Sequence, residues 1–81
     1  MPTILRRSGF EFVIRTHDHL PLHVHVLHGG TEVVVNLGME GNLPFVREMR
    51  GMSDRQIRRA LDITVENNEI FLIEWRRIPL Q

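Results

Sequence analysis

The stretch HVHVLHGGTEVVVNL, residues 23–37, decides the fold. Apolar and polar residues alternate on both sides of Gly29-Gly30, which is the pattern of two strands joined by a two-residue hairpin turn. A tight turn at these glycines brings four valines onto one side of the hairpin, because side chains alternate along each strand. They are Val24, Val26, Val33 and Val35. We therefore predict strands over His23–His28 and Thr31–Leu37, with an apolar face that belongs to the core.

The opposite face of the same hairpin is mixed in character. In this register His23 pairs with Asn36, and His25 pairs with Val34. Imidazole and amide groups seldom line a hydrophobic core. We therefore expect both histidines to point away from the hydrophobic interior.

A second hairpin is predicted upstream, with strands over Thr3–Arg7 and Phe10–Thr16 around the turn residues Ser8-Gly9. Its core face should hold Leu5, Phe10, Phe12 and Ile14. Its other face should hold Ile4, Arg6, Glu11, Val13 and Arg15. Residues 38–51 read as irregular, because glycine, asparagine and proline interrupt any pattern there. The simplest arrangement of these four strands is an antiparallel meander.

The last third of the chain reads as helix. Ser53 is placed to cap it, and Gln56 occupies the capping-box position. An apolar stripe with helical spacing follows, and it comprises Ile57, Ala60, Leu61, Thr64, Val65, Leu72 and Trp75. Asn67-Asn68 are expected to bend or break the helix. Within residues 69–78 the run 70–73 is rich in strand formers, so a further strand is the alternative there.

These elements define an α+β fold. We predict a four-stranded antiparallel meander sheet with one bent helix or two C-terminal helices packed on its apolar face. The 81 residues form one domain over 1–81, with a thin core. Binding to a partner, or to a second copy in a homo-oligomer, would add stability.

Composition narrows the functional classes. There is no cysteine, which excludes disulfides, a cysteine zinc site and a thiol nucleophile. No apolar run is long enough for a signal peptide or a membrane span, so a cytoplasmic protein without a membrane partner is expected. The net charge is zero, which argues against strong non-specific binding to nucleic acid.

All five histidines lie between residues 17 and 28. Imidazole titrates near neutral pH and suits general acid–base chemistry. Cleavage of RNA by its own 2′-hydroxyl needs a base, an acid and a cation. His23 and His25 are the acid–base candidates, with Asp18 and His19 orienting them. Arg6 and Arg15 would contact phosphate, and Asn36 lies on the same face.

A metal site is a second interpretation of the same stretch. The spacing of His23 and His25 places two imidazoles on one strand face, roughly 6–7 Å apart. A third ligand from the preceding loop, His19 or alternatively Asp18 or His17, would complete an open site for a divalent metal. A third interpretation is a protein interface, in which the histidines have a structural role.

A cluster of arginines surrounds the predicted helix start. Arg55, Arg58 and Arg59 share one face there, close to a helix N-terminus that favours anions. A phosphate or an acidic partner is one interpretation. The other is a solvated face in which Arg58 pairs with Asp62 one turn later.

The chain resembles the bacterial domain-of-unknown-function family 4160. The residues that carry the resemblance are MPTI at the start, Asp18-His19-x-Pro21 followed by His23-x-His25-Val26, Leu43-Pro44, Gly51, the arginine-rich helix start and Trp75. The family usually has a second proline where this chain has Leu22. Its motif histidines correspond to His19, His23 and His25, with Asp18 beside them. Members often occur beside another small domain, which implies a toxin–antitoxin-like pair.

The expected function is the toxin-like component of such a two-protein module, cleaving or binding RNA through the histidine face. The expected partner is a second small protein encoded nearby. A non-enzymatic interaction module that uses the mixed face and an exposed sheet edge is the alternative.

Overall fold

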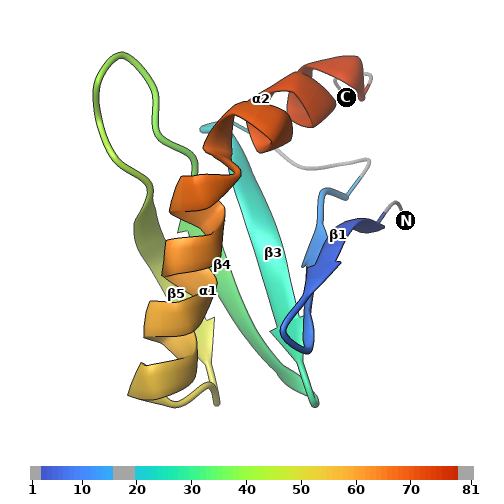
Figure 1. The fold of residues 1–81 in the computed structure, drawn as a ribbon, viewed down its shortest axis with the longest axis vertical. Helices are drawn as coiled ribbons and strands as arrows, with labels where there is room; N and C mark the ends of the chain where they lie inside the picture. The colour runs from blue at the N-terminus through green and yellow to red at the C-terminus, as the bar shows by residue number, and fades with distance from the viewer. Residues whose placement is uncertain (1–2, 16–19, 79–81) are drawn as a thin grey trace.

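The computed structural model describes residues 3–15 and 20–78 of the chain. It is an α+β domain with one antiparallel sheet and two C-terminal helices (Figure 1). The strands are β1 (Thr3–Arg7), β2 (Phe10–Val13), β3 (His23–His28), β4 (Thr31–Asn36) and β5 (Phe45–Arg50). The helices are α1 (Asp54–Glu66) and α2 (Asn68–Arg77). The strand order is β1-β2-β3-β4-β5, a simple meander.

The predicted register of the central hairpin is confirmed. Val24 pairs with Val35 and Val26 with Val33, and the four valines are fully buried in the core. Gly29 and Gly30 have φ angles of 51° and 81°. This left-handed geometry at both turn positions is the type I′ pattern that closes two-residue hairpins.

The prediction of four strands is wrong, because residues 45–50 form a fifth strand at the edge of the sheet. Two features hide β5 from sequence analysis. An edge strand is solvated on its outer side, so charged residues interrupt its pattern. A register shift also lies between Val34 and Val35. Because of it, the β5 residues opposite the core valines, Val46 and Met49, are three positions apart, whereas a regular strand would space them by two.

The first hairpin follows the predicted pairing near its turn, with Arg6 opposite Glu11 and Leu5 opposite Phe12. Farther from the turn, a register shift lies between Thr3 and Leu5. Ile4 therefore packs against the core cluster together with Leu5, and its placement on the mixed face was wrong. The described β2 strand ends at Val13, before the predicted end at Thr16.

Two helices cover the apolar face of the sheet. Figure 1 shows α1 running along β4 and β5, while α2 crosses near the start of β3. Their buried side chains pack with the valines in one core cluster: Ala60, Ile63, Phe71, Leu72 and Trp75. Within residues 3–15 and 20–78, neither helix has the length and apolar character that crossing a membrane requires.

The helical termini behave as the sequence indicates. Ser53 and Gln56 form the predicted capping box. Asn67 separates the helices, and its side chain donates to the carbonyl of Ile63. The alternative strand at 70–73 is wrong, because this segment is the middle of α2. Val65 is exposed, contrary to prediction, since Ile63 faces the core in that turn.

Candidate functional site

His23 and His25 lie on the face of the sheet that the helices do not cover. His23 pairs with Asn36, and His25 pairs with Val34, as predicted. Both side chains point away from the hydrophobic core, yet the residues are only 4% and 8% exposed. Arg15 and Glu32 contact His25, while Arg47 and the Trp75 ring lie near His23. We call this side of the sheet the histidine face.

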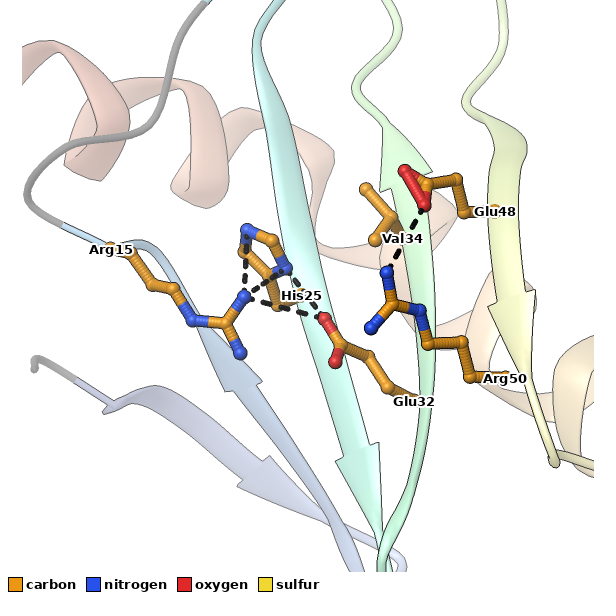
Figure 2. A pocket seen from close by; sticks show the side chains of 6 residues that line it. All are labelled: Arg15, His25, Glu32, Val34, Glu48 and Arg50. Carbon is orange, nitrogen blue, oxygen red and sulfur yellow. Dashed lines mark hydrogen bonds and ion pairs between the residues drawn. The ribbon is translucent and has the colours of Figure 1, made fainter.

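His25 lies between a cation and an anion (Figure 2). Its Nδ1 is 2.8 Å from Oε2 of Glu32 and 2.8 Å from Nη1 of Arg15. The same Nη1 is 3.4 Å from Glu32 Oε2, which forms an ion pair. Arg15 follows the end of β2, His25 belongs to β3 and Glu32 to β4, so three neighbouring segments supply the cluster.

The hydrogen-bond chemistry of this cluster depends on where the proton of His25 lies. A carboxylate only accepts and a guanidinium only donates, yet both approach Nδ1 of His25 to 2.8 Å. Nη1 of Arg15 is also 3.4 Å from Nε2. When Nδ1 carries the proton it donates to Glu32, and Nε2 is then the basic nitrogen of the neutral ring.

The pKa of Glu32 is lowered by this arrangement. Partial burial acts to raise the pKa of the carboxyl, but the hydrogen bond from His25 and the positive charge of Arg15 outweigh that effect. Hydrogen bonds and opposite charges favour the ionised form. Glu32 therefore remains a carboxylate throughout the neutral range.

A small hollow opens beside the His25 cluster. Its volume is about 120 Å³. The cluster of Arg15, His25 and Glu32 forms one side, and Glu48 and Arg50 from β5 form the other (Figure 2). The rim thus carries two guanidinium and two carboxylate groups around an imidazole. Such a site can hold a small polar or charged group within reach of an acid–base residue.

His23 has a different set of partners. Its Nδ1 is 2.8 Å from the carbonyl oxygen of Pro21 and 3.3 Å from Nη2 of Arg47. Arg47 donates to the same carbonyl at 3.2 Å and to Oδ1 of Asn36 at 2.8 Å. The indole of Trp75 donates to the carbonyl of His23 at 3.0 Å, and the two ring centroids are 6.3 Å apart.

The two imidazoles are neighbours, with ring centroids 5.0 Å apart and an edge-on orientation. Each Nδ1 is 2.8 Å from its own acceptor, the Pro21 carbonyl for His23 and the Glu32 carboxylate for His25. The residues that the structure describes contain no group of three or more histidine, cysteine or acidic side chains arranged for a metal ion. The third ligands considered, His17, Asp18 and His19, lie outside the described residues.

Several predicted site residues are not part of this cluster. Arg6 is on the edge strand β1, where it pairs with Glu11 at 3.5 Å. The helix-start residues Arg55, Arg58 and Arg59 are exposed, and Arg59 donates to the Ser8 hydroxyl. The structure thus joins His23, His25, Asn36 and Arg15, while these four arginines lie elsewhere.

The predicted register pairs Leu27 with Glu32 on the histidine face, as observed, but Glu32 was not among the predicted site residues, and Arg47 was not placed on this face. The register offered one signal for Glu32, which pairs with Leu27 two positions along from His25 on the same face. Diagonal neighbours in a sheet are within reach of long side chains. Arg47 had no such signal, because its strand was not predicted.

The chain was compared with protein families, curated proteins and solved structures. Neither the curated proteins nor the solved structures give a significant match. The family model described as "Domain of unknown function (DUF4160)" matches residues 9–76, which include all of the histidine face. The chain therefore belongs to the DUF4160 family.

Proposed function

We propose that this chain is the toxin-like component of a bacterial two-protein module and that it cleaves RNA at the hollow beside His25. The observation that carries the proposal is the Glu32–His25 contact of 2.8 Å with Arg15 alongside. A carboxylate that orients an imidazole, next to a cation, is the minimum set for acid–base chemistry on a phosphate.

Each residue would have a defined part in the reaction. Nε2 of His25 takes the proton from the 2′-hydroxyl, and that oxygen attacks the adjacent phosphorus. The bond from phosphorus to the 5′-oxygen breaks, leaving a 2′,3′-cyclic phosphate. A protonated His23, one ring away, gives its proton to the departing 5′-oxygen. Arg15 offsets the negative charge that builds up on the phosphate oxygens.

Glu32 supports this role through its lowered pKa. As a carboxylate it keeps the proton of neutral His25 on Nδ1, so Nε2 is the basic atom. It also stabilises the imidazolium that forms when His25 accepts the substrate proton. The charge on Glu32 would assist both the orientation and the basicity of His25.

The test is RNA cleavage by purified protein, together with growth inhibition on expression. We expect His25→Ala to lower the cleavage rate by about 10²–10⁴-fold, the usual contribution of an acid–base residue. Glu32→Gln should lower the rate less and shift its pH profile. His28→Ala is the matched control, because His28 lies at the end of the same strand with its ring against Phe10. Products should carry cyclic phosphate ends.

The proposal fails if the wild-type chain neither cleaves RNA nor slows growth, or if His25→Ala and His28→Ala behave alike. Every variant is first checked for folding by circular dichroism. Loss of activity in a folded His25→Ala protein is the result that supports catalysis.

A non-enzymatic interaction module is the second candidate. It is favoured by the low exposure of His23 and His25, since buried, hydrogen-bonded rings also serve to hold a sheet face rigid. Co-purification with the protein encoded by the neighbouring gene separates the two. If the His23→Ala, His25→Ala double variant loses the complex and the wild type has no activity, the interaction module is correct.

A divalent metal remains the third function considered for these histidines. The metal content of untagged protein tests it. A stoichiometric ion that is lost in the double variant would establish a metal site, whereas metal-free, active protein would exclude a metal-dependent reaction.

A further inference from the structure

Exposed apolar side chains gather at the end of the sheet where β5 begins. The four residues are Leu20, Met39, Leu43 and Phe45, which are 65%, 38%, 73% and 56% exposed. A groove of about 400 Å³ is lined by three of them, Met39, Leu43 and Phe45. Its apolar lining comprises Pro21, Leu22, Leu37, Met39, Leu43 and Phe45. We call it the β5 groove. Exposed apolar surface of this kind, concentrated at one place, marks binding sites on soluble proteins.

Backbone and side-chain hydrogen bonds hold the walls of the β5 groove in place. The N–H of Leu37 donates to the carbonyl of Leu22 at 2.9 Å, which joins two of the lining residues. The loop between β4 and β5 is fastened to α2 by Asn68, whose side chain contacts both the N–H and the carbonyl of Gly38 at 2.8 Å. The groove is therefore a formed site that needs little ordering before it binds.

A glycine at position 38 is required by the tight path of the loop between β4 and β5. A Cβ atom at this position would lie 2.3 Å from the carbonyl oxygen of Asn42, which is backbone and cannot move aside easily. The glycine allows the loop to close tightly on itself between Gly38 and Asn42, and Met39 and Leu43, on either side of this closure, line the groove.

A cation lies at the rim. Arg47 is exposed, yet it is fixed by bonds to Pro21 and Asn36, both of which line the groove. An immobilised guanidinium beside an apolar groove favours a ligand that combines an apolar group with a negative charge.

We propose that the β5 groove docks a second protein, which inserts an apolar side chain and places an acidic side chain against Arg47. The lining favours a protein over RNA, because it is mainly aliphatic and offers Phe45 as its single aromatic ring for stacking a base. The outer edge of β5 is charged and its pairing with β4 contains a register shift, features that discourage simple strand addition. The partner is therefore expected to bind through side chains in the groove.

The docking proposal is independent of the RNA-cleavage proposal. The groove lies at the Phe45 end of β5, whereas the hollow beside His25 is lined by Arg50 at the other end. His25→Ala should leave docking unchanged, and Leu43→Ser should leave cleavage by the isolated chain unchanged. Either proposal can therefore fail without the other.

The experiment selects short random peptides, displayed on phage, for binding to the full-length protein. Synthetic copies of the selected peptides are then measured by calorimetry against three variants. Leu43→Ser removes a groove side chain, and Arg47→Gln removes the rim charge. Ile73→Ser is the matched control, because Ile73 is a 53% exposed apolar residue on α2 outside the groove.

We expect selected peptides to carry an apolar residue next to aspartate or glutamate. They should bind Ile73→Ser as tightly as the wild type and bind Leu43→Ser about tenfold more weakly. Arg47→Gln should weaken binding and remove its salt dependence. Leu43 is mostly exposed, so its replacement should not disturb folding, which thermal denaturation checks.

Three results would overturn the proposal. One is peptide binding that is equal for Leu43→Ser and the wild type, or no selected peptide at all. Another is a wild-type homodimer, detected by size-exclusion chromatography with light scattering, that dissociates in the Leu43→Ser variant. That result would assign the groove to a second copy of the chain. The last is binding of labelled single-stranded RNA, measured by fluorescence anisotropy, that is lost in Leu43→Ser. That result would assign the groove to RNA.

Discussion

On one face of the sheet, four valines lie beneath two helices; on the other, two histidines lie beneath arginine and glutamate side chains. Both sets of side chains are nearly inaccessible to solvent. The valine face is stabilised by apolar area and close packing, which tolerate a change of shape if volume is kept. The histidine face is stabilised by hydrogen bonds, each of which needs a particular partner. Only the second face therefore holds groups with chemical reactivity in a fixed geometry.

The largest loss of stability should come from removing a buried side chain on the helix-covered face. Phe71 is fully buried, and its ring stacks on Phe12 with centroids 5.4 Å apart. Phe71→Ala should lower the free energy of unfolding by about 3–5 kcal/mol. For a domain of this size that is a large share of the total stability. Urea denaturation followed by circular dichroism measures it, and a loss below about 1 kcal/mol would show that the helix does not hold the core.

The next largest loss of stability is expected for a substitution on the histidine face. His25→Ala removes the donor to Glu32 and the ring beside Arg15, at an expected cost of about 1–3 kcal/mol. The loss is smaller than for Phe71→Ala, because Arg15 and Glu32 can still pair with each other across 3.4 Å. His28→Ala serves as the control in the same denaturation experiment. An unchanged unfolding free energy in His25→Ala would mean that the cluster contributes to chemistry alone.

Sequence analysis predicted the valine face well because its signal is local. Gly29-Gly30 fixes the turn, and alternation then places every side chain of the hairpin. The same logic placed His23 and His25 on the other face. The register also placed Glu32 on that face, diagonal to His25, although its contact with His25 was not predicted. Arg47 could not be placed there, because it comes from β5, whose charged, edge-strand composition was not recognised as a strand. Sites built from long side chains of neighbouring strands depend on pairing that one sequence does not reveal.

Adjacent valines on β4 allow a direct comparison of the two faces. Val33 is fully buried in the core, whereas Val34 lies on the histidine face and lines the hollow beside His25. Val33→Ala should cost about 2 kcal/mol, from lost apolar burial and the void left behind. Val34→Ala should cost about 1 kcal/mol less, because the hollow already admits solvent there. Equal losses in paired thermal denaturations would show that both valines are packed alike.

The smallest effect is the dependence of stability on pH at Glu32. Its pKa in the folded protein lies below the ordinary value of 4.5, so folding favours the ionised carboxylate. That contribution is complete above about pH 4.5 and is lost as the pH falls through the lower pKa of the folded state. Glu32 is only partly buried and solvent screens its charge, so the contribution should stay below about 1 kcal/mol.

Glu32→Gln removes this titration. The stability difference between wild type and Glu32→Gln should shrink as the pH falls below about 4.5, since the wild type loses its carboxylate while the variant has none to lose. Glu48→Gln is the control, because its contact with Arg50 is long at 3.9 Å and both side chains are exposed. A difference that grows as the pH falls would mean that Glu32 is held in its protonated form, and His25 would then lack the carboxylate that orients it.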